Sequence, residues 1–140
     1  MKIFYYFDPL LKISPVKKFF EELLTADGGG RHNQNIFKII SGKVEFLAEN
    51  NGRPIPPHAV PLRGYPFHEI KISDRHGLIR VLFFAHHSNK LILLSAFNKP
   101  KHYDEKGKNK KIHSFIEKEY NKALRYYEQF LNNPNFYEEF

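Results

Sequence analysis

Three basic residues interrupt the most apolar part of this sequence, residues 69–100. Lys71, Arg80 and Lys99 lie inside or at the end of its hydrophobic runs. A charged side chain in a core strand is costly unless it is paired or reaches water. Two interpretations are open. Either the cations meet on one exposed sheet face and hold a phosphodiester group through charge-assisted hydrogen bonds, or Arg80 pairs with Glu69 and the lysines extend to solvent.

The positive charge of the chain is concentrated around this stretch. The formal net charge is +7, and the segment from Arg63 to Lys111 holds eleven basic and four acidic residues, whereas the rest holds eleven of each. Such a local excess is typical of a protein that binds a polyanion, above all nucleic acid. The alternative is that the charge merely aids solubility. The candidates for phosphate binding around the cluster are Arg63, Lys101, Lys108, Lys110 and Lys111.

Three histidines, His68, His76 and His102, lie close to the cations in the sequence and could transfer protons, because imidazole titrates close to neutral pH, and His68 and His102 are our candidates for the site. The alternative for each histidine is that it takes no part in a reaction. His86 and His87 are adjacent, and neighbours on a strand point apart, so they cannot chelate one metal ion together. The sequence contains no zinc-ligand spacing, glycine-rich phosphate loop or serine nucleophile motif, and we predict neither a metal nor a cofactor.

Length and composition exclude several protein classes. The 140 residues fit one domain, which we expect to span residues 1–140. The sequence has no cysteine, which excludes disulfides and thiolate metal sites. Asp8 and Pro9 interrupt the first apolar run before it reaches the length of a signal-peptide core, and no window approaches the roughly 18 apolar residues of a membrane span. We expect a soluble cytoplasmic protein that does not contact the membrane.

The hydrophobic periodicity predicts an α+β fold with the element order β-α-α-β-β-β-α. Ser14 as N-cap and Pro15 at the first helical position predict the start of the first helix, which should end near Leu24. Short connections indicate that the three central strands form an antiparallel meander. The expected strands are 2–8, 65–73, 78–86 and 91–98, the expected helices are 14–24, 33–50 and 112–130, and 50–61 should be a loop.

Alternation along the strands assigns the cations to one face of the sheet. Aliphatic residues of the two central strands, such as Ile70 and Ile79, should pack on helices, and His68 should point to the same side. Lys71 and Arg80 then lie on the other, more open face as cross-strand neighbours. Like charges placed in this way repel each other, which makes sense if an anion binds between them.

Four segments of the sequence resemble the RelE/HigB superfamily of bacterial toxins, especially its phage-type HigB branch. They are "HEIKIS", "GLIRVLFF", "LILLSAFNKP" and a helix with "NKALRYYEQF", in the order and spacing of that family. The resemblance implies a RelE-like sheet, similar to that of microbial ribonucleases, with helices on one face and basic residues on the other. It also implies cleavage of messenger RNA, usually on the ribosome, and neutralisation by an antitoxin, often a HigA-like helix-turn-helix protein.

The resemblance extends to individual positions. Glu69 and Lys71 occupy the family's Glu-Leu-Arg motif, Arg80 its next arginine, and Phe97 and Lys99 its Phe-x-Lys motif. Two departures stand out. Lys71 replaces the usual arginine, which keeps the charge but loses the bidentate fork. Pro100 replaces a second lysine, and Lys101 follows one position later.

Ribonucleases of this type use the RNA's own 2′-hydroxyl as nucleophile and leave a 2′,3′-cyclic phosphate and a 5′-hydroxyl. The protein must orient the strand, stabilise developing charge and move two protons. We expect Arg80 to stabilise the transition state and Lys99, with Arg63, to hold flanking phosphates. Lys71 is a candidate base, because the neighbouring Arg80 would favour its neutral form. His68 or His102 are alternative proton carriers.

Two hypotheses from different classes therefore remain. The first is a toxin of a type II toxin–antitoxin system, an endoribonuclease that cleaves messenger RNA with or without the ribosome. The second is a non-catalytic module that binds RNA or a protein partner on the same fold, which the substitutions at Lys71 and Pro100 favour. A third, weaker one is a structural phage protein, which would show no salt-sensitive affinity for RNA.

Overall fold

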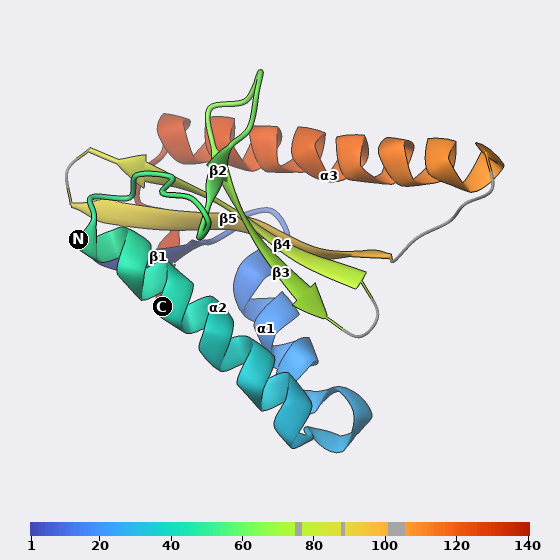
Figure 1. Cartoon of the computed structure of the whole chain (residues 1–140). Helices are drawn as coiled ribbons and strands as arrows, with labels where there is room; N and C mark the ends of the chain where they lie inside the picture. The colour runs from blue at the N-terminus through green and yellow to red at the C-terminus, as the bar shows by residue number, and fades with distance from the viewer. Residues whose placement is uncertain (75–76, 88, 101–105) are drawn as a thin grey trace.

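The computed structural model of the chain describes residues 1–74, 77–87, 89–100 and 106–140. It contains one six-stranded, mostly antiparallel sheet between helical layers (Figure 1). The element order predicted from the sequence is confirmed, and two short strands, β2 and β6, are added to it. The elements are β1 Lys2–Tyr6, α1 Pro15–Thr25, the 3₁₀ turn η1 Ala26–Gly28, α2 Arg31–Glu49, β2 Val60–Pro61, β3 His68–Asp74, β4 Gly77–His86, β5 Lys90–Pro100, α3 Lys106–Asn132 and β6 Tyr137–Glu139.

The strands lie in the order β2-β3-β4-β5-β1-β6. Strands β3, β4 and β5 form the predicted antiparallel meander. Strand β1 pairs in parallel with β5 and antiparallel with β6, so the first and last strands of the chain are neighbours. The short strand β2 falls inside the segment 50–61, which the sequence predicts as a loop. Its two residues extend the meander by one edge strand.

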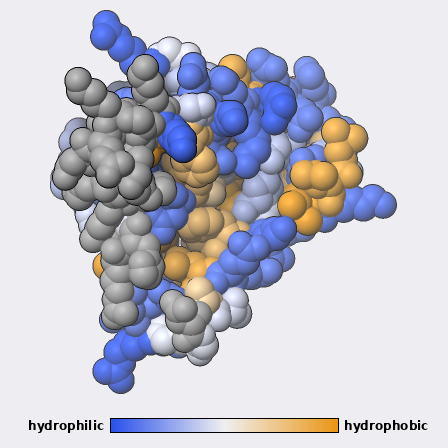
Figure 2. All heavy atoms as spheres, turned by 90° about the vertical axis from the view of Figure 1, so that its right-hand side faces the viewer, coloured by the Kyte–Doolittle hydropathy of each residue, from blue (hydrophilic) through white to orange (hydrophobic). Residues whose placement is uncertain are grey.

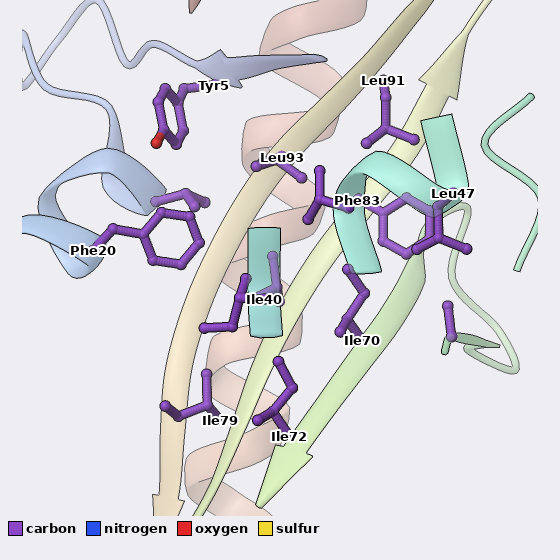
Figure 3. Packing of buried hydrophobic residues seen from close by; sticks show 14 of the residues in the cluster. Tyr5, Phe20, Ile40, Leu47, Ile70, Ile72, Ile79, Phe83, Leu91 and Leu93 are labelled. Carbon is purple, nitrogen blue, oxygen red and sulfur yellow. The ribbon is translucent and has the colours of Figure 1, made fainter. Parts of the chain in front are cut away.

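Helices α1 and α2 cover one face of the sheet (Figure 1), and Figure 3 shows buried side chains of the core on this face. The core there is apolar, and the predicted inward residues Ile70 and Ile79 are both fully buried. They pack with Ile40 and Leu47 of α2 and with Phe20 of α1. Burial of each such side chain contributes about 1.5–3 kcal/mol. The helix α1 starts at Pro15 as predicted, although the side chain of Ser14 makes no capping hydrogen bond.

The opposite face of the sheet is covered by α3, and the prediction that it is the more open face is wrong. Helix α3 lies across this face of the sheet (Figure 1). Its residues Ala123, Tyr126 and Phe130 are buried against sheet residues that include Leu82 and Phe84. The periodicity of α3 predicts an apolar stripe but carries no information about which side of the sheet the stripe meets.

A β-bulge in β5 sets the side-chain directions near the cations. Leu82 pairs with Ser95, but the next residue, Phe83, pairs with Leu93, so Leu94 is an extra residue. Such a bulge reverses the alternation of the strand. Even-numbered residues of β5 such as Ile92 face α3 before the bulge, and odd-numbered residues face it after the bulge. As a result, Phe97 lies opposite Arg80 and joins the core beneath α3.

Candidate functional site

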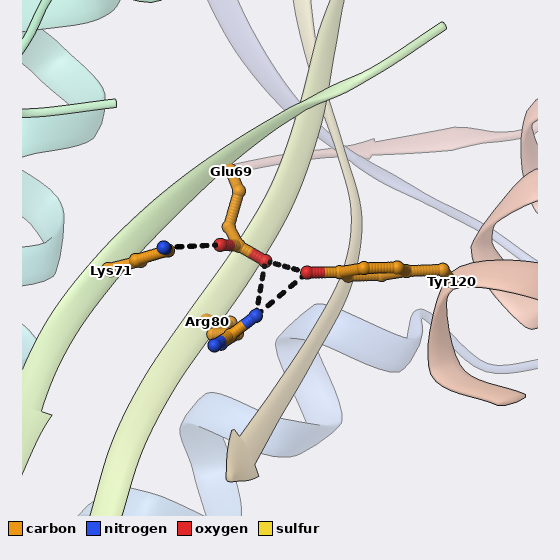
Figure 4. Close-up of polar contacts among 4 residues, drawn as sticks. All are labelled: Glu69, Lys71, Arg80 and Tyr120. Carbon is orange, nitrogen blue, oxygen red and sulfur yellow. Dashed lines mark hydrogen bonds and ion pairs between the residues drawn. The ribbon is translucent and has the colours of Figure 1, made fainter. Parts of the chain in front are cut away.

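Four side chains from β3, β4 and α3 meet on the α3 face of the sheet (Figure 4). Glu69 and Lys71 come from β3, Arg80 from β4 and Tyr120 from α3. We call these four residues the charged cluster. The register pairs Lys71 directly with Arg80, as the sequence predicts. Glu69 lies two positions before Lys71 and therefore points to the same face.

The cluster is connected by short polar contacts. Nη1 of Arg80 donates to Oε2 of Glu69 at 3.3 Å and to the hydroxyl of Tyr120 at 2.8 Å. The Tyr120 hydroxyl in turn donates to Oε2 of Glu69 at 2.6 Å. Nζ of Lys71 lies 3.7 Å from the other oxygen of Glu69, Oε1. The pairing of Arg80 with Glu69, one of the two interpretations left open by the sequence, is the arrangement that the structure adopts.

Burial within the cluster separates an inner from an outer part. Glu69 is fully buried and Arg80 is 8% exposed, whereas about half (48%) of the Lys71 side chain is exposed. The expectation that Arg80 lies on an open face is therefore wrong, because α3 and Tyr120 cover it. A buried ion pair of this kind contributes little net stability, but removal of one partner leaves a costly uncompensated charge.

Tyr120 was not among the predicted site residues. Burial raises the pKa of its phenol, with further upward contributions from the hydrogen bond to Glu69 and from the Glu69 charge, while Arg80 acts in the opposite direction. The phenol is therefore protonated at neutral pH. Its ring packs edge-on against Tyr65 at 5.2 Å and Phe97 at 6.2 Å. The sequence signal for Tyr120 was only its place in the apolar period of α3, which is typical of a core residue.

The other predicted cations occupy different positions. Lys99 pairs with Leu78 beyond the bulge, which places its partly exposed side chain on the face of the charged cluster. Arg63 is exposed between β2 and β3, and Lys111 is exposed on α3. Lys108 and Lys110 belong to α3, but their side chains lie outside the described part of the structure. His76, Lys101 and His102 lie outside the described residues altogether.

His68 is on the wrong face of the sheet to act with the cations. It pairs with Phe83, whose ring lies 5.5 Å away in the core beneath α1 and α2. Burial lowers the pKa of His68. Within the described residues, its Nδ1 is buried without a hydrogen-bond partner. The sequence predicts the direction of this side chain correctly, and that direction separates it from the charged cluster.

One cation of the charged cluster is accessible from outside. At the end of the molecule that faces the viewer in Figure 2, apolar residues lie in a hollow that hydrophilic residues border on its described side. Lys71 supplies an accessible ammonium group next to the buried carboxylate, guanidinium and phenol. Among the described residues, no group of His, Asp or Glu side chains is placed to hold a metal ion. No helix in the described ranges is long and apolar enough to cross a membrane.

Comparison with known proteins assigns the chain to a family. No curated protein matches the sequence. Residues 26–128 match the family described as "Phage derived protein Gp49-like (DUF891)", and this range includes the whole charged cluster. The match covers more than half of the 140 residues. The chain therefore belongs to the phage-derived Gp49-like family, a family of RelE/HigB-type toxin-like proteins.

Proposed function

We propose that this protein is the toxin of a type II toxin–antitoxin system and that it cleaves messenger RNA as an endoribonuclease of the phage-type HigB branch. Membership in a family of RelE/HigB-type toxin-like proteins supports the toxin role. The concentration of positive charge between Arg63 and Lys111 supports an RNA substrate. Such a charge distribution attracts polyanions and speeds their association.

The charged cluster is the observation that carries the proposal. It brings a carboxylate, an ammonium, a guanidinium and a protonated phenol into direct contact. Cleavage by an internal 2′-hydroxyl requires a proton acceptor, a proton donor and fixed positive charge. The cluster contains one or more candidates for each of these roles.

In the proposed reaction the 2′-hydroxyl oxygen attacks the adjacent phosphorus, and the bond between phosphorus and the 5′-oxygen breaks. Glu69 accepts the proton of the 2′-hydroxyl, and Tyr120 donates its proton to the leaving 5′-oxygen. The products are a 2′,3′-cyclic phosphate and a 5′-hydroxyl. Arg80 and Lys71 stabilise the negative charge that develops on the phosphoryl oxygens. Lys71 thus acts as a cation in this scheme rather than as the base.

Access to the cluster requires a movement of α3. Glu69 and Arg80 are buried, so the RNA can contact them only after Tyr120 has moved outward. The buried side chains of the described part of α3 all follow Tyr120 in the sequence, at Ala123, Tyr126 and Phe130. Among the described side chains before it, residues 111–119, none is buried, although Ile116 and Phe115 contact the core beneath α3. We include outward displacement of this segment in the proposed mechanism.

The remaining predictions complete the proposal. Lys99, Arg63 and Lys111 bind phosphates that flank the cleaved bond, with contributions from Lys101, Lys108 and Lys110, and His102 is a further candidate for proton transfer. Residues 1–140 act as one domain in the cytoplasm. The partners are messenger RNA, the ribosome and a HigA-like helix-turn-helix antitoxin.

An RNA cleavage assay tests the proposal. The purified full chain is incubated with end-labelled messenger RNA, with and without ribosomes, and the new ends are analysed. We expect cyclic-phosphate ends and growth arrest when the protein is expressed without an antitoxin. Lys71→Gln should slow cleavage by about a hundredfold. Lys38→Gln, an equal charge change on the exposed face of α2, should cleave like the wild type. Absence of cyclic-phosphate ends under both conditions would refute the enzymatic role.

A non-catalytic RNA- or protein-binding module is the second candidate. The observation in its favour is that Glu69 and Arg80 already pair with each other and with Tyr120. Lys71 is then the part of the cluster that a ligand can reach directly. This candidate predicts salt-sensitive binding of RNA, weakened in Lys71→Gln, that leaves the RNA intact.

A further inference from the structure

A second group of basic residues lies at the end of the sheet where β5 begins. The register places Lys90 of β5 beside Lys2 of β1 on one side and His86 of β4 on the other. Paired residues on adjacent strands point to the same face. The ring of His86 lies 5.0 Å from that of Phe130 in α3, so this is the α3 face. We call Lys2, Lys90 and His86 the basic row.

The two lysines of the basic row line an open cavity of about 640 Å³. Nζ of Lys90 lies 5.0 Å from the centre of the Tyr137 ring, and Phe4 packs edge-on against the same ring at 4.7 Å. These contacts hold Lys90 at the cavity wall without neutralising its charge, since an aromatic ring attracts a cation but carries no charge. The described residues that line the cavity include no acid; they are Met1, Lys2, Phe4, Asn89, Lys90 and Tyr137.

The electrostatics of the basic row differ from those of the charged cluster. In the cluster, Glu69 lies between Lys71 and Arg80 and offsets part of their charge. In the basic row, Lys2 and Lys90 are cross-strand neighbours of like charge, an arrangement that costs stability. The register brings Glu139 of β6 opposite Phe4, so one carboxylate borders the row from the side. An anion between the two ammonium groups would remove their repulsion.

His86 is the third member of the row. Burial lowers its pKa, and the neighbouring His87 and Lys90 act in the same direction. It is therefore neutral at pH 7, and the row carries the charge of its two lysines. A neutral imidazole can still donate one hydrogen bond to an anion.

We propose that the cavity beside the basic row is a second phosphate-binding site, which holds the backbone of an RNA strand at a distance from the charged cluster. Lys2 and Lys90 contact phosphate oxygens, and Asn89 offers its amide to the same strand. The identification of the strand as RNA depends on the proposed function, whereas the recognition of phosphate depends only on the cavity and its charges.

The two sites lie on one face of the sheet but far apart along it. Lys90 begins β5 and Phe97 is the partner of Arg80 on the same strand. At about 3.3 Å per residue, the separation along the strand is roughly 20 Å. A short RNA can therefore occupy one site at a time, whereas a longer strand can bridge both. The basic row then adds affinity for long RNA without taking part in cleavage.

Binding of uncleavable RNA tests this proposal separately from the enzymatic one. The full chain is titrated with fluorescent 2′-O-methyl RNA, a single-stranded oligomer long enough to bridge the sites and a dinucleotide, at several salt concentrations. Lys2→Gln/Lys90→Gln is compared with the wild type. The control is Lys18→Gln/Lys38→Gln, which makes the same charge change on exposed positions of α1 and α2. Thermal unfolding verifies that all variants are folded.

For the long RNA we expect Lys2→Gln/Lys90→Gln to bind about tenfold more weakly at physiological salt, with a salt slope reduced by about 1.4, because two phosphate contacts are lost. The control should retain its affinity and slope. Equal losses in both double variants, or none in Lys2→Gln/Lys90→Gln, would refute the second site. If that variant loses affinity although the wild type cleaves no RNA, the second site stands and only the enzymatic role fails.

Discussion

The two faces of the sheet bury different kinds of side chain. The face under α1 and α2 buries aliphatic and aromatic residues such as Ile70, Ile79 and Leu93. The face under α3 also buries a charged pair, Glu69 and Arg80. The hydrophobic attraction between apolar side chains has no preferred direction. A buried ion pair, in contrast, depends on the presence of both partners. The first face is suited to hold the fold together and the second to carry a site.

The largest expected effect is on the buried pair. Glu69→Ala leaves Arg80 in the core without its carboxylate, so the free energy of unfolding should fall by about 3–5 kcal/mol in chemical denaturation. The control Glu69→Leu/Arg80→Leu replaces both charges by apolar groups and should recover most of this loss. If Glu69→Ala is as stable as the wild type, the fold does not depend on the pairing of Glu69 with Arg80.

A truncation on the opposite face gives the comparison a reference. Ile70→Ala removes a fully buried side chain from the core beneath α1 and α2. The loss of burial and the remaining cavity should cost about 2–4 kcal/mol in the same denaturation experiment. Unlike the loss in Glu69→Ala, this one cannot be recovered by a change at Arg80. Recovery by Arg80→Leu would indicate that the two faces are coupled.

A smaller effect is expected where α3 meets the charged cluster. Tyr120→Phe removes the hydroxyl that accepts from Arg80 and donates to Glu69. Loss of these partly buried bonds, one of them to the fully buried Glu69, should cost about 1–3 kcal/mol in unfolding free energy. Tyr126→Phe, a change in the same helix outside the cluster, serves as the control. If both variants lose equally, the Tyr120 hydroxyl has no special role in the attachment of α3.

The smallest effect concerns the dependence of stability on pH. Each face of the sheet carries a histidine whose pKa is lowered. Burial lowers the pKa of His68 beneath α1 and α2 and that of His86 beneath α3. Each then binds fewer protons in the folded than in the unfolded chain, so stability is complete above the unfolded pKa of about 6.5 and declines as pH falls below it. His68→Gln should show a weaker decline in unfolding free energy between about pH 7 and 5. An unchanged pH profile would contradict burial of the imidazole.

Local patterns were sufficient to predict most elements and one contact of the site. Period-two alternation in β3 and β4 correctly predicted that Ile70 and Ile79 face helices and that Lys71 pairs with Arg80. The same alternation predicted the direction of His68. It does not show that this face is covered, although Leu82 and Phe84 on it are apolar. These two residues mark the position of α3.

Other features of the site depend on contacts between distant segments. The bulge at Leu94 has no local sequence signal, yet it decides that Phe97 faces Arg80. Tyr120 joins Glu69 across 51 positions of the chain. The short strand β6 pairs with the edge of β1 that β5 leaves open. No periodicity within a single segment can predict such pairings.

The sequence by itself determined the order of helices and strands, the alternation of β3 and β4 and the concentration of positive charge, because each of these depends on residues close together along the chain. Only the tertiary structure decided which face α3 covers, that Arg80 pairs inward with Glu69 and Tyr120 rather than facing solvent, and that Lys2 meets Lys90 at the far end of the sheet. The physical reason is that burial and ion pairing depend on packing between elements, and packing brings together residues whose spacing in the sequence is arbitrary.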